Sequence, residues 1–145
     1  MNPVFKKLGL TNQNPILVLN APAEYQPLMA EIEAEIHTAV KGRYKFIQIF
    51  AQEMAEAVRL TKESIGSLEE GGHFWFCYPK GASKKYKSDI SRDKSWEVLA
   101  PYNFEPVTLV AIDDDWSAMR FKHVDTIKEM KRKTAATEKG KERIK

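Results

Sequence analysis

Three short apolar segments, separated by stretches with helical spacing, constrain the fold of this chain more than any other feature. They cover residues 16–19, 44–50 and 73–78. The unbroken apolar character of the first and third is typical of strands buried on both faces, as in parallel sheets. Strands that alternate with helices favour right-handed crossovers and a largely parallel sheet with helices on both faces.

Three helices are expected between and after these strands. In the first, from Pro27 to Val40, apolar residues recur at spacings of four. The second starts near Gln52, is separated from the third strand by Gly71-Gly72, and presents one apolar face, consisting of Met54, Val58, Thr61, Ile65 and Leu68. The third covers residues 91–100, with Ser91 as its N-cap and with Trp96 and Leu99 turned inward.

Two more strands close the domain. Residues 107–112 and 118–121 are apolar, and the polar link 113–117 between them is short enough for an antiparallel hairpin. The sequence therefore predicts a three-layer α/β/α fold in the order βαβαβαββ, with a mostly parallel five-stranded sheet that ends in an antiparallel hairpin. The third strand should be interior, with the last strand inserted beside it.

The charge of the chain is unevenly distributed. Residues 125–145 hold eight Lys or Arg and four Asp or Glu, a net +4, whereas the whole chain carries +3. We expect residues 1–124 to form a single domain and residues 125–145 to be a basic, flexible tail. A second basic patch covers residues 80–94. Solvated surface is the simpler interpretation of both patches, and nucleic-acid binding is the alternative.

The single cysteine, Cys77, excludes an internal disulfide. A chain without a disulfide, an N-terminal apolar signal segment or an apolar stretch of membrane-spanning length is expected in the cytoplasm, with no membrane partner. Zinc is not expected, because one cysteine and three scattered histidines lack ligand spacing. The segment 80–85 holds one glycine and does not match a phosphate-binding loop.

Residues 15–22, 71–80 and 110–117 read PILVLNAP, GGHFWFCYPK and VAIDDDWS. Together they resemble a bacterial family that is catalogued as a domain of unknown function, over about residues 15–122. The resemblance implies a small stand-alone cytoplasmic α/β protein. It brings no activity, cofactor or catalytic residue with it.

A looser similarity is to the second half of class I methyltransferases, in which a Gly-Gly turn, a buried strand, a helix and a terminal hairpin follow in this order. Those enzymes hold their adenosyl cofactor with a glycine-rich turn after the first strand, because glycine lets the backbone approach the ligand. Here that position reads Asn20-Ala21-Pro22-Ala23-Glu24, without a glycine. We therefore predict no cofactor and no catalytic residue.

The candidate site follows from position, because ligands of open α/β sheets collect at the carboxyl ends of the parallel strands. Lys80 should be the main cation there, opposite Asp113 or Asp115, in a shallow pocket for a small anionic or zwitterionic ligand. A structural ion-pair network is the alternative, and the adjacent aspartates also suit a turn better than a metal site. The candidate residues are Asn20, Gln52, Lys80, Ser83, Lys84, Asp113, Asp115 and Trp116.

Because no catalytic pattern stands out, a non-catalytic binding or regulatory module is the leading functional prediction. The first alternative is a degenerate or unconventional methyltransferase-like transferase. The second is a weak nucleic-acid-binding protein that acts through its basic patches.

Overall fold

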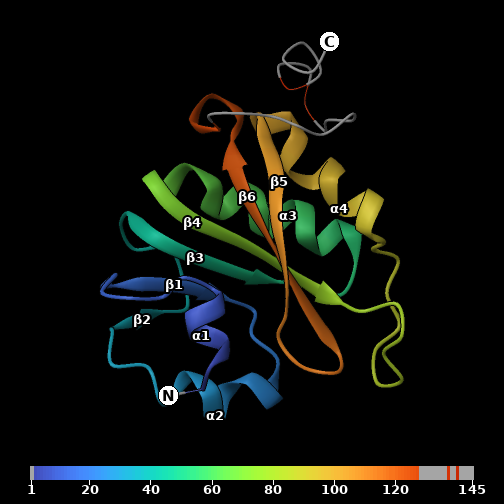
Figure 1. Ribbon diagram of the computed structural model, residues 1–145, viewed down its shortest axis with the longest axis horizontal. Coiled ribbons are helices and arrows are strands. Elements are labelled where there is room, and N and C mark those ends of the chain that lie inside the picture. The colour runs from blue at the N-terminus through green and yellow to red at the C-terminus, as the bar shows by residue number, and fades with distance from the viewer. Residues whose placement is uncertain (1, 128–136, 138–139, 141–145) are drawn as a thin grey trace.

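The computed structural model describes residues 2–127, 137 and 140. Its centre is a six-stranded sheet in the order β2-β1-β3-β4-β6-β5 (Figure 1). Strands β1 to β4 are mutually parallel, and β6 runs antiparallel to both β4 and β5. The strands are β1 (Ile16–Leu19), β2 (Ile36–His37), β3 (Tyr44–Phe50), β4 (Leu68–Pro79), β5 (Phe104–Ala111) and β6 (Trp116–His123).

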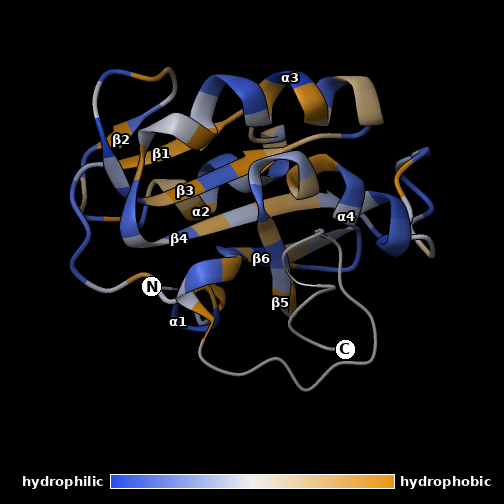
Figure 2. Ribbon diagram, turned by 90° about the horizontal axis from the view of Figure 1, so that it is seen from above, coloured by the Kyte–Doolittle hydropathy of each residue, from blue (hydrophilic) through white to orange (hydrophobic). Residues whose placement is uncertain are grey.

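Helices cover both faces of the sheet, as Figure 2 shows from above. On one face α1 (Val4–Lys7) and α2 (Gln26–Met29) pack over a core that includes Trp75. On the other, α3 (Met54–Ser64) and α4 (Arg92–Leu99) pack over a core that includes Phe74. The predicted three-layer α/β/α fold is therefore confirmed.

Four short 3-10 segments join these elements: η1 (Ala23–Tyr25), η2 (Ile65–Ser67), η3 (Ala100–Tyr102) and η4 (Val124–Thr126). The predicted interior place of the third strand is confirmed, since β4 lies between β3 and β6. So is the insertion of the last strand beside it. Ser91 caps α4 as predicted, because its hydroxyl accepts a hydrogen bond from the Lys94 N–H at 3.2 Å.

The helix predicted from Pro27 to Val40 is wrong. The helix ends at Met29, and Ile36–His37 forms strand β2 beside β1, which raises the number of strands from five to six. Between residues 31 and 36 exposed and half-buried positions alternate, which is the period of an extended chain. Residues four positions apart share a face both in a helix and in an extended strand, so the spacing of the apolar residues does not distinguish a helix from a strand.

The second helix is shorter than predicted and buries a different face. It begins at Met54, ends at Ser64, and buries Ala57, Leu60, Thr61 and Ser64. Val58, which was assigned to the buried face, is 50% exposed, because the face that packs against the sheet runs through the four residues named above. Leu68 and Gly71-Gly72 belong to β4, whose register against β3 shifts between Tyr44 and Phe46.

Helix α1 was not predicted, because four residues carry no periodic pattern. It covers the sheet through Phe5 and Leu8, both fully buried. The carbonyl oxygen of Leu8 also accepts a hydrogen bond from the Trp75 indole at 2.8 Å. This contact joins the start of the chain to the middle of the sheet.

Most of the predicted tail, residues 125–145, lies outside the described residues, so the domain boundary at residue 124 and the mobility of the tail stay predictions. Within this segment Thr137 is described, and it is buried against β5. No helix within the described ranges has both the length and the apolar character to cross a bilayer.

Candidate functional site

The candidate site lies at the carboxyl edge, which is the edge of the sheet where β1, β3 and β4 end and β6 begins (Figure 1). Successive crossovers from β1 lead to opposite sides: β2 lies on one side of β1, and β3 on the other. The point where the strand order reverses is therefore between β1 and β3. Open α/β sheets bind their ligands in the crevice at such a point.

Asn20 occupies this reversal point directly after β1. Its backbone has φ of 62°, in the left-handed region that glycine reaches without cost and that asparagine tolerates. Its side-chain amide donates a hydrogen bond of 2.9 Å to the carbonyl oxygen of Phe50, the last residue of β3. Asn20 thus takes a conformation that favours glycine, while its side chain ties the ends of β1 and β3 together.

Beside Asn20 lies an open groove of about 460 Å³, which we call the switch-point groove. Its apolar walls include Leu60 of α3 and Val40, which follows β2 and is 39% exposed. Its rim carries Arg59 and Glu63, whose side chains form an ion pair of 3.2 Å. The remaining lining residues are Leu19, Asn20, Thr38 and Ala39.

The loop of residues 80–90, here called the cap loop, crosses the rest of the carboxyl edge and is held at several points. Gln52 donates through its side-chain amide to the carbonyl oxygen of Lys87 at 2.7 Å. The Gln52 carbonyl oxygen accepts from the Ser88 hydroxyl at 2.5 Å. The Asp89 carboxylate accepts from the Met54 N–H at 2.8 Å, at the start of α3.

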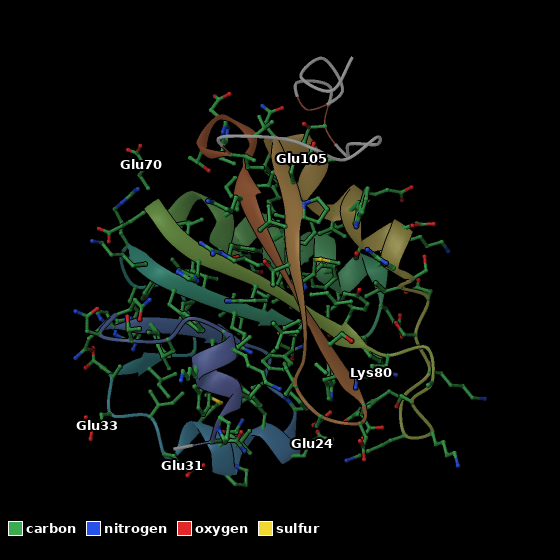
Figure 3. All side chains as sticks on the ribbon, viewed as in Figure 1. Glu24, Glu31, Glu33, Glu70, Lys80 and Glu105 are labelled. Carbon is green, nitrogen blue, oxygen red and sulfur yellow. The ribbon has the colours of Figure 1, made fainter. Side chains whose placement is uncertain are left out.

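On the other side, the cap loop binds the segment that follows β1. The Lys85 ammonium lies 2.6 Å from the Glu24 carboxylate, and the Tyr86 hydroxyl donates to the same carboxylate at 2.6 Å. Partial burial alone would raise the pKa of Glu24, but the hydrogen bonds from Lys85 and Tyr86 outweigh it and lower that pKa. Figure 3 shows Glu24 and Lys80 at the same end of the molecule, opposite Glu70.

The predicted aspartates act mainly in the structure of the β5–β6 link. The Asp113 carboxylate accepts the N–H groups of Asp115 and Trp116 at 2.8 Å, as in an aspartate turn. The Asp115 carboxylate accepts from the Ser83 hydroxyl at 2.8 Å. Trp116 is 4% exposed and packs edge-on against Tyr86, with ring centroids 5.0 Å apart.

The structure brings the eight predicted residues to one edge but not into one pocket. Asn20 lines the switch-point groove, whereas Lys80 lines a separate groove beside α4. Within the described residues, Lys80 forms no ion pair with Asp113 or Asp115; its backbone N–H instead donates to the Asp115 carbonyl oxygen at 2.8 Å. Lys84 is exposed. Gln52, Ser83, Asp115 and Trp116 hold the cap loop in place.

Several residues of this edge were not identified from the sequence. Glu24 and Tyr86 are 62 positions apart, and no local pattern indicates that they meet. Arg59 and Val40 lie on opposite sides of a groove whose existence depends on β2, which was predicted as helix. The signal that could have found β2 is the alternation of glutamates with smaller apolar residues between positions 31 and 36.

In the part of the chain that the structure describes, no three His, Cys, Asp or Glu side chains are grouped to hold a metal ion. Cys77 is fully buried, and burial raises the pKa of its thiol.

The side chains of the basic patch at residues 80–94 make different contacts, and Lys85 among them is bound to Glu24. The other patch lies mostly outside the described residues.

No protein-family model matches the chain, and no curated protein matches it. Several solved structures, however, are similar to it. The glycopeptide N-methyltransferase MtfA is similar with a TM-score of 0.54 and 11% identity, over 82% of this chain and 87% of that chain. Its complex with S-adenosylmethionine gives 0.53 and 11%, over 81% and 90%, and its complex with sinefungin gives 0.52 and 11%, over 82% and 83%.

This likeness concerns the fold. The chain has a methyltransferase-like Rossmann fold with a mostly parallel sheet and an antiparallel hairpin. The predicted similarity to methyltransferases is confirmed at that level. The resemblance to the bacterial domain family stays a prediction.

Proposed function

We propose that this protein binds a small adenosyl-type ligand in the switch-point groove and is methyltransferase-like in its ligand as well as in its fold. The observation that carries the proposal is the position of the groove at the carboxyl ends of β1 and β2, where it is bordered by Asn20, the residue at which the strand order reverses. The solved structures with this fold include complexes with S-adenosylmethionine and sinefungin. S-adenosylmethionine is therefore the first ligand to test.

The chemistry of the groove suits such a ligand. Its volume of about 460 Å³ lies within the range of small-molecule pockets, which is about 300–1,000 Å³. An amino-acid end, which carries an ammonium and a carboxylate, can pair with Glu63 and Arg59 on the rim. An aromatic base can pack against Val40 and Leu60 on the walls. The sequence predicts a small anionic or zwitterionic ligand at this edge, but beside Lys80 and not in this groove.

The ligand could serve group transfer or a non-catalytic binding role. The fold favours group transfer, because the similar structures reported above are those of an N-methyltransferase. The left-handed backbone of Asn20 also supports it, since this is the conformation that a glycine-rich turn provides. Because residues 20–24 hold no glycine, any ligand here would border Asn20 and not a glycine-rich turn. We assign no residue to catalysis.

Isothermal titration with S-adenosylmethionine and S-adenosylhomocysteine tests the proposal. Wild-type protein should bind both, and Arg59→Gln should weaken binding by about tenfold, because a hydrogen bond to a charged group contributes ~1.5 kcal/mol or more. Lys62→Gln is the matched control: it removes the same charge from an exposed position of α3 that does not line the groove. If neither ligand binds, the adenosyl proposal is rejected.

A methyl-transfer assay separates the two roles. Wild-type protein is incubated with S-adenosylmethionine labelled in its methyl group and a panel of amine and hydroxyl acceptors. A labelled product that is lost in Arg59→Gln and kept in Lys62→Gln supports a transferase. Tight binding without any transfer to the panel supports the non-catalytic module instead.

A further inference from the structure

We propose that a second groove at the carboxyl edge, beside α4, is a binding site for the phosphate group of a small molecule. This cationic groove has a volume of about 590 Å³ and is open to solvent. It lies between the end of β4, the cap loop and the first turn of α4. Its lining residues include Tyr78, Lys80, Asp89, Arg92, Lys94 and Ser117.

The charges that line the groove favour an anion. Lys80, Arg92 and Lys94 contribute three cations, and Asp89 contributes the one carboxylate. That carboxylate already accepts a hydrogen bond from the Met54 N–H at the start of α3. Burial raises the pKa of Tyr78 overall, while the hydrogen bond with Ser95 and the positive charge of Arg92 act to lower it, so the charge of Arg92 reaches this wall of the groove. The net charge of the lining is therefore +2.

Backbone donors add to these charges at the start of α4, which has eight residues. The Ser91 hydroxyl satisfies the N–H of Lys94, and the Ser95 N–H donates to the Ser91 carbonyl oxygen. Within the described part of the chain, the N–H groups of Arg92 and Asp93 have no acceptor. Free N–H groups and the helix dipole favour anions at such an end, and phosphate is a common occupant.

Ser117 provides an independent indication of a ligand. It lies on β6 opposite Tyr78, lines the groove, and is 9% exposed. Its hydroxyl forms no hydrogen bond with any residue that the structure describes. The hydroxyl oxygen is not among the fully buried side-chain atoms that lack a partner, so it is accessible from the groove and can bind a ligand there. A phosphate oxygen in the groove would satisfy it.

The groove is also held open before any ligand arrives. Ser88 and Asp89 anchor the cap loop to Gln52 and Met54, and Ser83 anchors it to Asp115. These bonds tie the cap loop to the end of β3, to the start of α3 and to the β5–β6 link. A site that is already formed loses less entropy on binding than one that must close around its ligand.

The cationic groove and the switch-point groove share no lining residue. The phosphate proposal therefore does not depend on adenosyl binding, and either can fail while the other stands. Wild-type protein without S-adenosylmethionine is sufficient for the test.

The experiment is a titration of the full chain with inorganic phosphate, and then with pyrophosphate, followed by the amide resonances of the cap loop and α4 at constant ionic strength. We expect saturable shifts for residues of the groove. Lys80→Gln and Arg92→Gln should each weaken binding about tenfold, as for the loss of a charged hydrogen bond. Lys84→Gln is the matched control, because it removes one charge from the same loop outside the groove.

Ser117→Ala should weaken phosphate binding several-fold and leave the Tm within a few degrees of the wild type, since its hydroxyl has no partner to lose. The proposal is overturned if wild-type protein shows no saturable shift, or if Lys84→Gln weakens binding as much as Lys80→Gln. It is also overturned if a short DNA or RNA duplex displaces phosphate with a steep salt dependence, because that result would assign the groove to nucleic acid.

Discussion

The Tyr86 hydroxyl lies 2.6 Å from both carboxylate oxygens of Glu24, which joins the middle of the cap loop to the segment after β1. The Tyr86 ring also packs against Trp116 of β6. One side chain therefore links the cap loop to two elements of the carboxyl edge. The cap loop in turn forms one wall of the cationic groove, so this contact bears on the site as well as on stability.

Tyr86→Phe should lower the free energy of unfolding by about 1.5 kcal/mol, because it removes a partly buried hydrogen bond to a charged group and keeps the ring. Urea denaturation measures the change. Tyr102→Phe is the control, since the hydroxyl of this half-buried tyrosine forms no hydrogen bond among the described residues. Equal stability of the two variants would contradict a role for the Glu24–Tyr86 bond.

The contribution of Glu24 should depend on pH. Its folded pKa is lowered, so its contribution is present above the ordinary value of 4.5 and is lost as the pH falls through the folded pKa. The stability difference between wild-type protein and Glu24→Gln should therefore shrink as the pH is lowered below 4.5. Urea denaturation at a series of pH values checks this, and a constant difference across the series would contradict the shift.

The sequence predicted the elements whose pattern has one interpretation. The apolar runs at β1 and β4 are too short for helices and are typical of strands buried on both faces, and Ser91 before α4 has the side chain that an N-cap needs. It could not predict β2, because its apolar spacing fits a helix and a strand equally. Two residues suffice for β2 only because Ile36 and His37 pair with the rigid edge of β1.

The sequence predicted the location of the candidate site better than the contacts within it. Lys80 and Asn20 follow strands, so their edge was predictable from the strand order. The cationic groove depends on the path of the cap loop, which is set by distant pairs such as Glu24 with Tyr86. The switch-point groove depends on β2 and on Asn20, whose side chain binds the distant Phe50. Such pairs leave no local signal in a single sequence.

Asn20→Ala should be less stable than Asn20→Gly by about 1 kcal/mol. Both variants lose the hydrogen bond to the Phe50 carbonyl oxygen, but only alanine pays for the left-handed backbone. Asn103, with φ of 65°, should show the same gap between its alanine and glycine variants. Thermal unfolding of the four variants measures it, and an Asn20→Ala protein as stable as Asn20→Gly would contradict the assigned backbone.

Cys77 should not react with thiol reagents in the folded protein at neutral pH. Its side chain is fully buried in β4, and burial raises the pKa of the thiol, so almost no thiolate is present. Titration with a chromogenic disulfide should give no colour until denaturant is added, and then one equivalent. Fast reaction without denaturant would mean that β4 opens readily.

Thr137→Val should destabilise the protein by about 1–3 kcal/mol, because the buried carboxylate of Glu105 loses a donor. Glu105 lies on β5 with no exposed surface, and its Oε2 accepts the Thr137 N–H at 2.7 Å and the Thr137 hydroxyl at 2.6 Å. Valine keeps the volume and the N–H but removes the hydroxyl. Thr108→Val, at an exposed position of the same strand, is the control and should change stability little. Urea denaturation of both variants compares them. If Thr137→Val is as stable as the control, Thr137 does not hold Glu105 in solution, and the Glu105 carboxylate must be satisfied in another way.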